Sequence, residues 1–324
     1  MDRPTPRPAR GSGLRLGPQP RTADLDGPVS WVDHGGPEDG QLVVAVHGLG
    51  GSHANWHDLA PLLTREHRVV AVDLAGHGRT PRAGRSASIP ANCELLGRFL
   101  DHVDDRPAVL LGNSMGGALS LLHAAARPES VAGLALIGPA LPRTALPGRA
   151  LARQVALFAV PGMAERSLGR RRARLGAEAF VEATLQLTCA DPSMVSAEVR
   201  ELAVQVACDR SLDRDADAAF LEAARSLAVL VTRAARYRAL IASVRVPGIV
   251  LQGREDRLVP AGGTSLLAEL QPGWPVHLLD GVSHVPQIEA PQPTAELLLP
   301  FLDGLQPAAA PAGSSSSDLL AGAS

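Results

Sequence analysis

Short, nearly continuous apolar runs alternate along this chain with segments whose apolar residues recur at helical spacing. An apolar run of about four to eight residues, bounded by glycine or polar residues, is typical of a strand buried on both faces of a parallel sheet. Such runs lie at 41–48, 67–74, 107–113, 131–138, 246–253 and 274–281. The helical segments lie at 91–103, 115–127, 263–270 and 293–305. This alternation predicts an α/β fold with a doubly wound, mostly parallel sheet.

The middle of the chain has no convincing strand. Residues 141–245 are rich in alanine, leucine and arginine, with breaks in the helical pattern at 161–162 and 189–194. A helical block between two sheet-forming parts predicts a cap that lies over one edge of the sheet. We therefore expect a core formed by 28–140 and 246–305, with 141–245 as its cap.

The two ends differ from the rest in composition. Residues 1–27 are rich in proline, arginine and glycine and lack the apolar stretch of a signal peptide, and 306–324 are of low complexity. These features predict a disordered leader and a disordered tail. No segment approaches the roughly 18 apolar residues of a membrane span. Sparse cysteines at positions 93, 189 and 208, without metal-ligand spacing, indicate reduced thiols in a cytoplasmic protein that has no metal site.

Charge and composition narrow the classes of partner. The 324 residues are 45% hydrophobic and 20% charged, which is the balance of a soluble globular protein. The net charge of -2 gives no overall field that attracts nucleic acid, and aromatic residues make up 3% of the chain. We expect a small-molecule substrate and no nucleic-acid partner.

One serine lies where a predicted strand meets a predicted helix. The stretch LLGNSMGGALS at 110–120 matches the pattern G-x-S-x-G around Ser114. In a strand–turn–helix elbow the serine projects above the sheet, and the crowded turn requires small neighbours such as Gly112 and Gly116. The following helix directs free N–H groups toward the serine, so the Met115 N–H can stabilise an oxyanion.

A second oxyanion donor is available after the first apolar run. The sequence HGLGG begins at His47 and forms a glycine-rich loop in which Gly48 and Leu49 can approach the serine. We expect the Leu49 N–H to be the partner of the Met115 N–H, and the substrate to contact Gly48, Leu49 and Met115. His47 itself is interpreted as a residue that fixes the loop.

The serine needs a base, and one histidine stands out. His284 follows the last predicted strand, at the sheet edge where α/β folds bind ligands. Asp256 follows the preceding strand and can accept a hydrogen bond from the imidazole Nδ1–H. Glu255 competes for that role, and a surface ion pair of Asp256 with Arg254 or Arg257 is the structural alternative. The order Ser114, Asp256, His284, each after a predicted strand, is that of the α/β-hydrolase arrangement.

The chain from 29 to 305 resembles capped α/β-hydrolases, a group of serine esterases, cofactor-free haloperoxidases and meta-cleavage carbon–carbon hydrolases. The resemblance is carried by HGLGG, DLAGHGRTP, GNSMGG, GREDRLVP and GVSHVPQIEAP. In DLAGHGRTP it implies structural roles for Asp73 and His77. A serine at the elbow differs from the aspartate nucleophile of epoxide hydrolases and haloalkane dehalogenases. Val285 replaces the tryptophan that commonly follows the histidine of carbon–carbon hydrolases, and Met115 replaces the tryptophan of the haloperoxidases.

These features favour a carboxylic ester or thioester substrate with a largely apolar acyl or alcohol group, and chemistry without a cofactor. Three alternatives stay open. A carbon–carbon hydrolase or a hydrolase-fold ligand receptor would carry the same residues. A lipase that docks on membranes would use the arginine-rich segment 166–176, which is otherwise a solvated helical face.

Overall fold

The computed structural model describes residues 17–142 and 163–305. Its strands form one eight-stranded sheet in the order β1-β2-β4-β3-β5-β6-β7-β8. The strands are β1 (Arg21–Asp24), β2 (Pro28–Gly35), β3 (Gln41–Val46), β4 (His67–Val72), β5 (Ala108–Asn113), β6 (Val131–Ile137), β7 (Gly248–Gly253) and β8 (Val276–Leu279). All neighbours from β4 to β8 are parallel, which confirms the predicted α/β fold.

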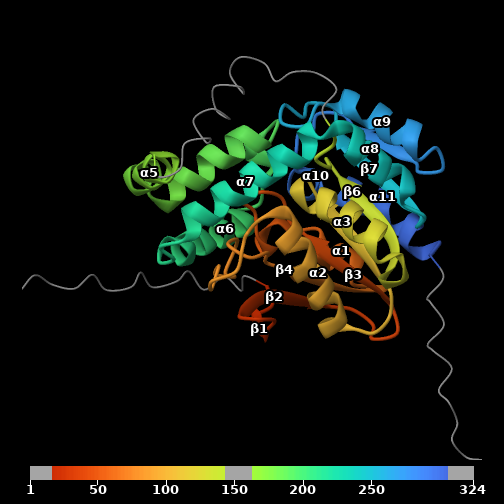
Figure 1. Cartoon of the computed structure of the whole chain (residues 1–324), viewed down its shortest axis with the longest axis horizontal. Coiled ribbons are helices and arrows are strands. Elements are labelled where there is room, and N and C mark those ends of the chain that lie inside the picture. The colour runs from red at the N-terminus through yellow and green to blue at the C-terminus, as the bar shows by residue number, and fades with distance from the viewer. Residues whose placement is uncertain (1–16, 143–162, 306–324) are drawn as a thin grey trace, which may run out of the picture.

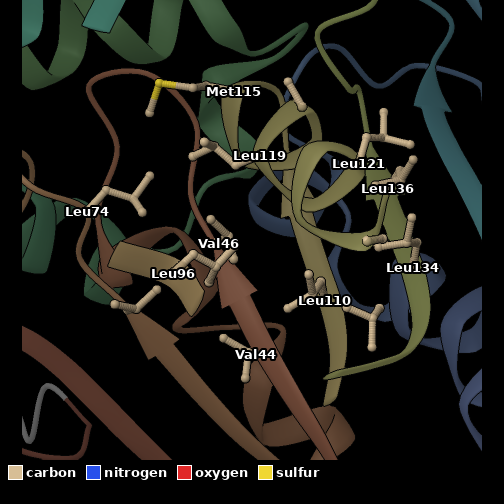
Figure 2. Packing of buried hydrophobic residues seen from close by; sticks show 14 of the residues in the cluster. Val44, Val46, Leu74, Leu96, Leu110, Met115, Leu119, Leu121, Leu134 and Leu136 are labelled. Atoms are coloured by element: carbon tan, nitrogen blue, oxygen red, sulfur yellow. The ribbon is translucent and has the colours of Figure 1, made fainter. Parts of the chain in front are cut away.

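Helices cover both faces of the sheet because successive strand residues point to opposite sides. They are α1 (Ala60–Leu63), α2 (Ile89–Val103), α3 (Met115–Ala126), α8 (Ala234–Ser243), α9 (Thr264–Leu270), α10 (Pro286–Glu289) and α11 (Pro291–Asp303). Val44, Val46 and Leu110 pack against residues of α2 and α3, as Figure 2 shows. Val43 and Val109 face the other way, toward a cluster that includes residues of α1 and α11. The parallel strands are therefore apolar on both faces, as their sequences predict.

The antiparallel edge of the sheet differs from the sequence prediction. β1 and β2 form a hairpin, and β2 pairs antiparallel with β4. β1 lies inside 1–27, so the predicted disordered leader is wrong at its end. In β1 only Ala23 is buried, because the strand lies at the sheet edge, and such a strand has no apolar run to reveal it. Residues 1–16 and the predicted tail 306–324 lie outside the described residues.

Helices α5 (Met163–Thr188), α6 (Ala197–Ser211) and α7 (Ala216–Thr232) form the cap, which Figure 1 shows grouped at one side of the sheet. α5 ends at Thr188 and a 3₁₀ turn follows at Pro192–Met194, so the predicted break at 189–194 is present. The predicted break at 161–162 lies outside the described residues. Gly176 interrupts α5 with a φ of 75° and a ψ of 172°, which divides it into two helical parts.

The end of the predicted cap belongs to the core. α8 lies within 141–245, yet its Tyr237 and Ile241 are buried in the main cluster together with residues of α2 and α3. The Tyr237 hydroxyl donates to the Ala140 carbonyl at 2.9 Å. The sequence missed this because a helix that covers a sheet and a helix of a cap carry the same apolar spacing.

Within the described ranges, no helix has the length and apolar character needed to cross a membrane. Cys93, Cys189 and Cys208 are free thiols in this structure.

Candidate active site

Ser114 occupies a strained turn between β5 and α3. Its φ of 54° and ψ of -113° lie in a region that residues with a side chain rarely adopt. Its N–H donates to the Ile137 carbonyl at 3.0 Å, and its carbonyl accepts from the Ala140 N–H at 3.0 Å. These bonds to the end of β6 and the residues after it hold the strained conformation.

The glycines around Ser114 are required by close backbone contacts. A Cβ atom at Gly116 would lie 2.0 Å from the Val46 carbonyl oxygen, and one at Gly112 would lie 2.7 Å from the Gly116 carbonyl group. Both distances are far below any real contact. The small residues of G-x-S-x-G therefore allow α3 to begin directly against β3 and β5, which directs Ser114 away from the sheet.

His284 and Asp256 form a buried hydrogen-bonded pair. The His284 Nδ1 lies 2.7 Å from the Asp256 Oδ2, and both side chains are almost fully shielded from solvent. Oδ2 also accepts from the Gln252 side chain, and Oδ1 accepts from the N–H groups of Leu258 and Val259. Because an ionised carboxylate only accepts, it fixes the tautomer with the proton on Nδ1. The His284 Nε2 then carries a lone pair, and it has no hydrogen-bond partner within 17–142 and 163–305.

Two carboxylates, Asp256 and the adjacent Glu255, are candidates for the partner of the His284 imidazole, and their contacts differ. Glu255 is exposed, and its carboxylate reaches only the Gly281 N–H at 3.4 Å. Arg254 pairs with Asp280, so it does not form the surface ion pair considered for Asp256. Of the two adjacent carboxylates, Asp256 is the one that contacts the imidazole.

A side-chain amide and a close approach at a glycine hold the serine turn and the His–Asp pair at the same edge of the sheet. The Asn113 side chain donates to the Ile137 carbonyl at 3.0 Å and to the His284 carbonyl at 3.1 Å. A Cβ atom at Gly138 would lie 3.4 Å from both the Asp256 Oδ2 and the His284 Nδ1. Asn113 therefore links the elbow to the histidine loop, a role that the sequence analysis missed. The only signal for it is its position directly before the serine.

The HGLGG loop lies beside the elbow. A Cβ atom at Gly48 would be 3.1 Å from the Ser114 Cβ, which places the loop backbone against the serine. Within the part of the chain that the structure describes, the N–H groups of Leu49 and Met115 donate to no other group. Met115 is fully buried and packs in the main core cluster, whereas Leu49 is only partly buried.

His47 fixes this loop, as predicted. Its Nε2 accepts from the Leu74 N–H at 3.1 Å, and its Nδ1 lies 2.7 Å from the Gly48 carbonyl. An imidazole that accepts at one nitrogen and donates at the other is neutral. Burial lowers the pKa of His47 below its usual value and favours this neutral form.

The cap reaches the same loop. A Cβ atom at Gly50 would lie 3.1 Å from the Phe220 ring of α7, and one at Gly76 would lie 2.3 Å from the Ala219 Cβ. Phe220 is half-buried and places an apolar ring next to the HGLGG loop. The sequence does not distinguish Phe220, because the helical spacing of α7 gives no sign of which residue faces the loop.

A second His–Asp pair joins the residues after the HGLGG loop to the end of β4. The His53 Nδ1 is 3.0 Å from the Asp73 Oδ2, and the carboxylate also accepts from the N–H groups of His53 and Arg79. The Arg79 guanidinium lies 3.4 Å from the His53 Nε2. Burial, with His57 and His53 nearby, lowers the pKa of His34 to about 4 in the same region. His34, His53, His57 and Arg79 border a cavity of about 60 Å³.

The described residues contain no group of three or more histidine, cysteine, aspartate or glutamate side chains suited to a metal ion. The groups described above at the edge of the sheet are a hydroxyl, an imidazole, a carboxylate and backbone N–H groups.

Comparison with known proteins agrees with this geometry. The family model described as the alpha/beta hydrolase fold matches residues 41–291. The chain belongs to the α/β-hydrolase family. This membership makes it a hydrolase of that fold, and the family match spans both parts of the core and the cap between them.

Individual relatives are similar at modest identity. The chain is 32% identical over 295 residues to the dihydrolipoyllysine-residue acetyltransferase component of the acetoin cleaving system of Pseudomonas putida, which covers 90% of this chain and 71% of that protein. It is 31% identical to a 2-hydroxy-6-oxo-2,4-heptadienoate hydrolase of Pseudomonas putida, covering 81% and 89%. It is 28% identical to the monoglyceride lipase of Rattus norvegicus, covering 83% and 82%. The names of these relatives thus describe different reactions.

Proposed function

We propose that the protein is a serine hydrolase that cleaves a carboxylic ester or thioester through an acyl-enzyme. The observation that carries this proposal is the buried His284–Asp256 pair, 2.7 Å between Nδ1 and Oδ2, at the sheet edge where Ser114 holds a φ of 54°. A hydroxyl has a pKa far above neutrality and becomes a nucleophile only beside a base. An imidazole oriented by a carboxylate is such a base.

In the first half of the reaction, the Ser114 Oγ attacks the acyl carbonyl carbon while the His284 Nε2 takes the hydroxyl proton. The bond to the leaving alcohol or thiol breaks, and the leaving group receives that proton from His284. Asp256 stays ionised and stabilises the imidazolium. In the second half, His284 deprotonates water, which attacks the acyl-enzyme, and the acid leaves as Ser114 regains its proton. Each step uses protein groups and water alone.

The N–H groups of Leu49 and Met115 serve as the oxyanion hole. Both lie next to Ser114 and have no other partner in the described chain. The Met115 N–H belongs to the first turn of α3, where the partial positive charge of the helix end also favours an oxyanion. Removal of one such donor from a comparable site costs roughly 3–4 kcal/mol in transition-state stabilisation.

The residues around the loop favour an apolar group on the substrate. Leu49 is partly buried, and the Phe220 ring lies against Gly50, so two apolar side chains lie at the HGLGG loop. The rat relative is named a monoglyceride lipase, and the acetoin-system relative is named an acetyltransferase for dihydrolipoyllysine residues. These names support an acyl group bound to oxygen or to sulfur. A cytoplasmic location and the lack of a nucleic-acid partner remain predictions.

A second candidate is hydrolysis of a carbon–carbon bond, favoured by the relative that acts as a heptadienoate hydrolase. Val285 follows the catalytic histidine candidate in place of the tryptophan common in that group, which favours the ester. Parallel assays with a chromogenic short-chain ester, a thioester and a vinylogous 1,5-diketone separate the three bond types. A burst of one equivalent without turnover would instead indicate a ligand receptor.

The decisive experiment compares Ser114→Ala with Ser120→Ala. Ser120 lies on the same α3 helix, where its hydroxyl donates to the Gly116 carbonyl, so this change is a matched loss of one buried hydroxyl. We expect Ser114→Ala to lose ester turnover and labelling by a fluorophosphonate, and Ser120→Ala to keep both. A folded Ser114→Ala protein with undiminished turnover would refute the proposal.

A further inference from the structure

Glu289 is a buried carboxylate that takes no part in the proposed reaction. It lies at the end of α10, five residues after His284, and it is 4% exposed. Its two oxygens bind two different segments. Oε1 accepts from the Ser283 N–H at 2.9 Å, and Oε2 accepts from the Ala190 N–H at 2.6 Å. One carboxylate therefore joins the residue before His284 to the segment that follows α5 of the cap.

A second contact joins the same two segments. The His284 N–H donates to the carbonyl of Thr188, the last residue of α5, at 2.9 Å. The backbone of His284 is thus bonded directly to Thr188 of the cap. The neighbouring Ser283 is linked to Ala190 of the cap through the Glu289 carboxylate. The Asn113 side chain holds the His284 carbonyl from the core.

Apolar packing surrounds these bonds. Val285 and Ile288, which flank the turn after His284, are buried in a cluster of their own with residues of α5 and α6. The cap members of this cluster are Val181, Leu185, Cys189, Val195 and Val199. The histidine loop therefore packs against the second part of α5, beyond the Gly176 kink, as well as against the sheet.

We propose that Glu289 is a positioning residue that fixes the His284 loop to the junction between α5 and the following 3₁₀ turn, so that His284 is in place only while this part of the cap is docked. The inference rests on the proposed role of His284 as the base. It implies that the cap segment from Ala177 to Val199 is a fixed part of the active site during turnover.

The chemistry of the two bonds requires a carboxylate. Both partners of Glu289 are backbone donors, so both of its oxygens must accept. Glutamine has the same length but presents one oxygen and one NH₂ group, and the NH₂ would face a donor. Burial raises the pKa of Glu289 and the N–H groups oppose this rise, as expected for a carboxylate held in a protein interior.

The test uses Glu289→Gln in the full chain, with Glu296→Gln on the exposed face of α11 as the matched control. We expect Glu289→Gln to lower kcat for a chromogenic ester by about 10- to 100-fold, with KM changed by less than about threefold, because the base is misplaced while the pocket is kept. Glu296→Gln keeps both constants. Glu289→Asp keeps two accepting oxygens on a shorter side chain and restores part of kcat.

Cys189 provides a readout that does not depend on activity. It lies directly before Ala190, is buried, and has a pKa raised to about 12 by burial, so its thiol is protected in the docked state. In a Cys93→Ser, Cys208→Ser background, Cys189 is the one thiol that remains of the three in the sequence. The Glu289 carboxylate also raises the Cys189 pKa, so labelling rates are compared per thiolate, with the pKa of Cys189 measured in each variant. On that basis we expect Glu289→Gln to raise the labelling rate by at least about tenfold, because the segment opens more often.

The outcomes are separable. A lower kcat at constant KM with faster Cys189 labelling supports the proposal. A lower kcat with unchanged labelling, or faster labelling with unchanged kcat, overturns it, and so does no change in either. Should Glu289→Gln fail to fold, the same two readouts on Glu289→Asp decide. Failure of the underlying function appears elsewhere, as retained turnover in Ser114→Ala.

Discussion

Among the residues that the structure describes, two histidine–aspartate pairs have both side chains buried, and they are alike in contact and different in surroundings. In both, an imidazole Nδ1 lies within hydrogen-bond distance of a carboxylate, at 2.7 Å for His284–Asp256 and 3.0 Å for His53–Asp73. In both, the carboxylate follows a parallel strand and accepts from backbone N–H groups. Neither the bond nor the burial distinguishes them.

The difference lies at the far nitrogen of the ring. The His53 Nε2 faces the Arg79 guanidinium, so this nitrogen is not open to take a proton from a substrate. Arg79 also pairs with Asp209 of the cap. The His284 Nε2 has no hydrogen-bond partner among the described residues. A His–Asp pair is suited to catalysis when its second nitrogen is left free beside a nucleophile. We therefore propose a structural role for the His53–Asp73 pair and a catalytic role for the His284–Asp256 pair.

The largest expected effect comes from His284→Leu. Loss of the base removes activation of Ser114, so kcat for an ester falls by about 10⁴-fold or more. The fold is kept, because Asp256 retains three donors, from Gln252, Leu258 and Val259. Steady-state kinetics measure the loss of kcat, and a thermal melt checks that the fold is kept. Wild-type turnover in this variant would remove His284 from the mechanism.

We expect the same substitution at the other pair, His53→Leu, to lower stability and to leave kcat nearly unchanged. Asp73 loses a charge-assisted bond in a fully buried site, so we expect the free energy of unfolding to fall by about 2–4 kcal/mol. kcat per folded molecule stays within about tenfold of the wild type, because the ring touches no reacting atom. Urea unfolding followed by circular dichroism measures the first effect. A kcat loss comparable to that of His284→Leu would erase the distinction between the pairs.

We expect acid to lower the free energy of unfolding through His34, which lies near His53 and His57. Burial lowers the pKa of His34 to about 4, whereas in the unfolded chain it stays near 6.5. The unfolded state thus binds this proton first as the pH falls, so stability is lost between about pH 6.5 and 4. His34 alone accounts for about 3 kcal/mol over that range. Urea titrations at pH 7 and pH 4.5 on the wild type and His34→Gln test this, and an equal loss in both proteins would exclude His34 as the cause.

The smallest expected effect is that of Glu255→Gln, which distinguishes Glu255 from the adjacent Asp256. Glu255→Gln changes kcat by less than about twofold, because its side chain is exposed and remote from the imidazole. Asp256→Asn lowers kcat by about 10⁴-fold, since an amide cannot hold the required tautomer. If the two variants were equally impaired, the assignment of the acid would have to be revised.

Most of the fold follows from sequence because parallel strands are apolar on both faces. The runs that become β3 to β7 have boundaries within a few residues of those predicted. The hairpin of β1 and β2 carries mixed polar sequence at an edge, so it has no such run. α8 has the spacing of any amphipathic helix, and only its contacts in the structure, the burial of Tyr237 and Ile241 and the Tyr237–Ala140 bond, show that it packs on the core.

For the site, chain order brought Ser114, Asp256 and His284 into one hypothesis, and the structure brings the last two into contact. Sequence could not have chosen Asp256 over Glu255 by composition, since the choice depends on which side chain the turn after β7 buries. Asn113, Phe220 and Glu289 were missed for a related reason. Each acts through a contact with a segment far away in the chain, and helical or strand spacing carries no information about such a contact.

The bond between Tyr237 and Ala140 has a practical consequence. Ala140 donates to the Ser114 carbonyl, so the chain's one tyrosine supports the residues that hold the elbow. Burial raises the pKa of its phenol well above the usual value, and the ring therefore stays un-ionised in alkaline solution until this support is lost. Ultraviolet titration of that single phenol would monitor the integrity of the nucleophile turn without any substrate or label.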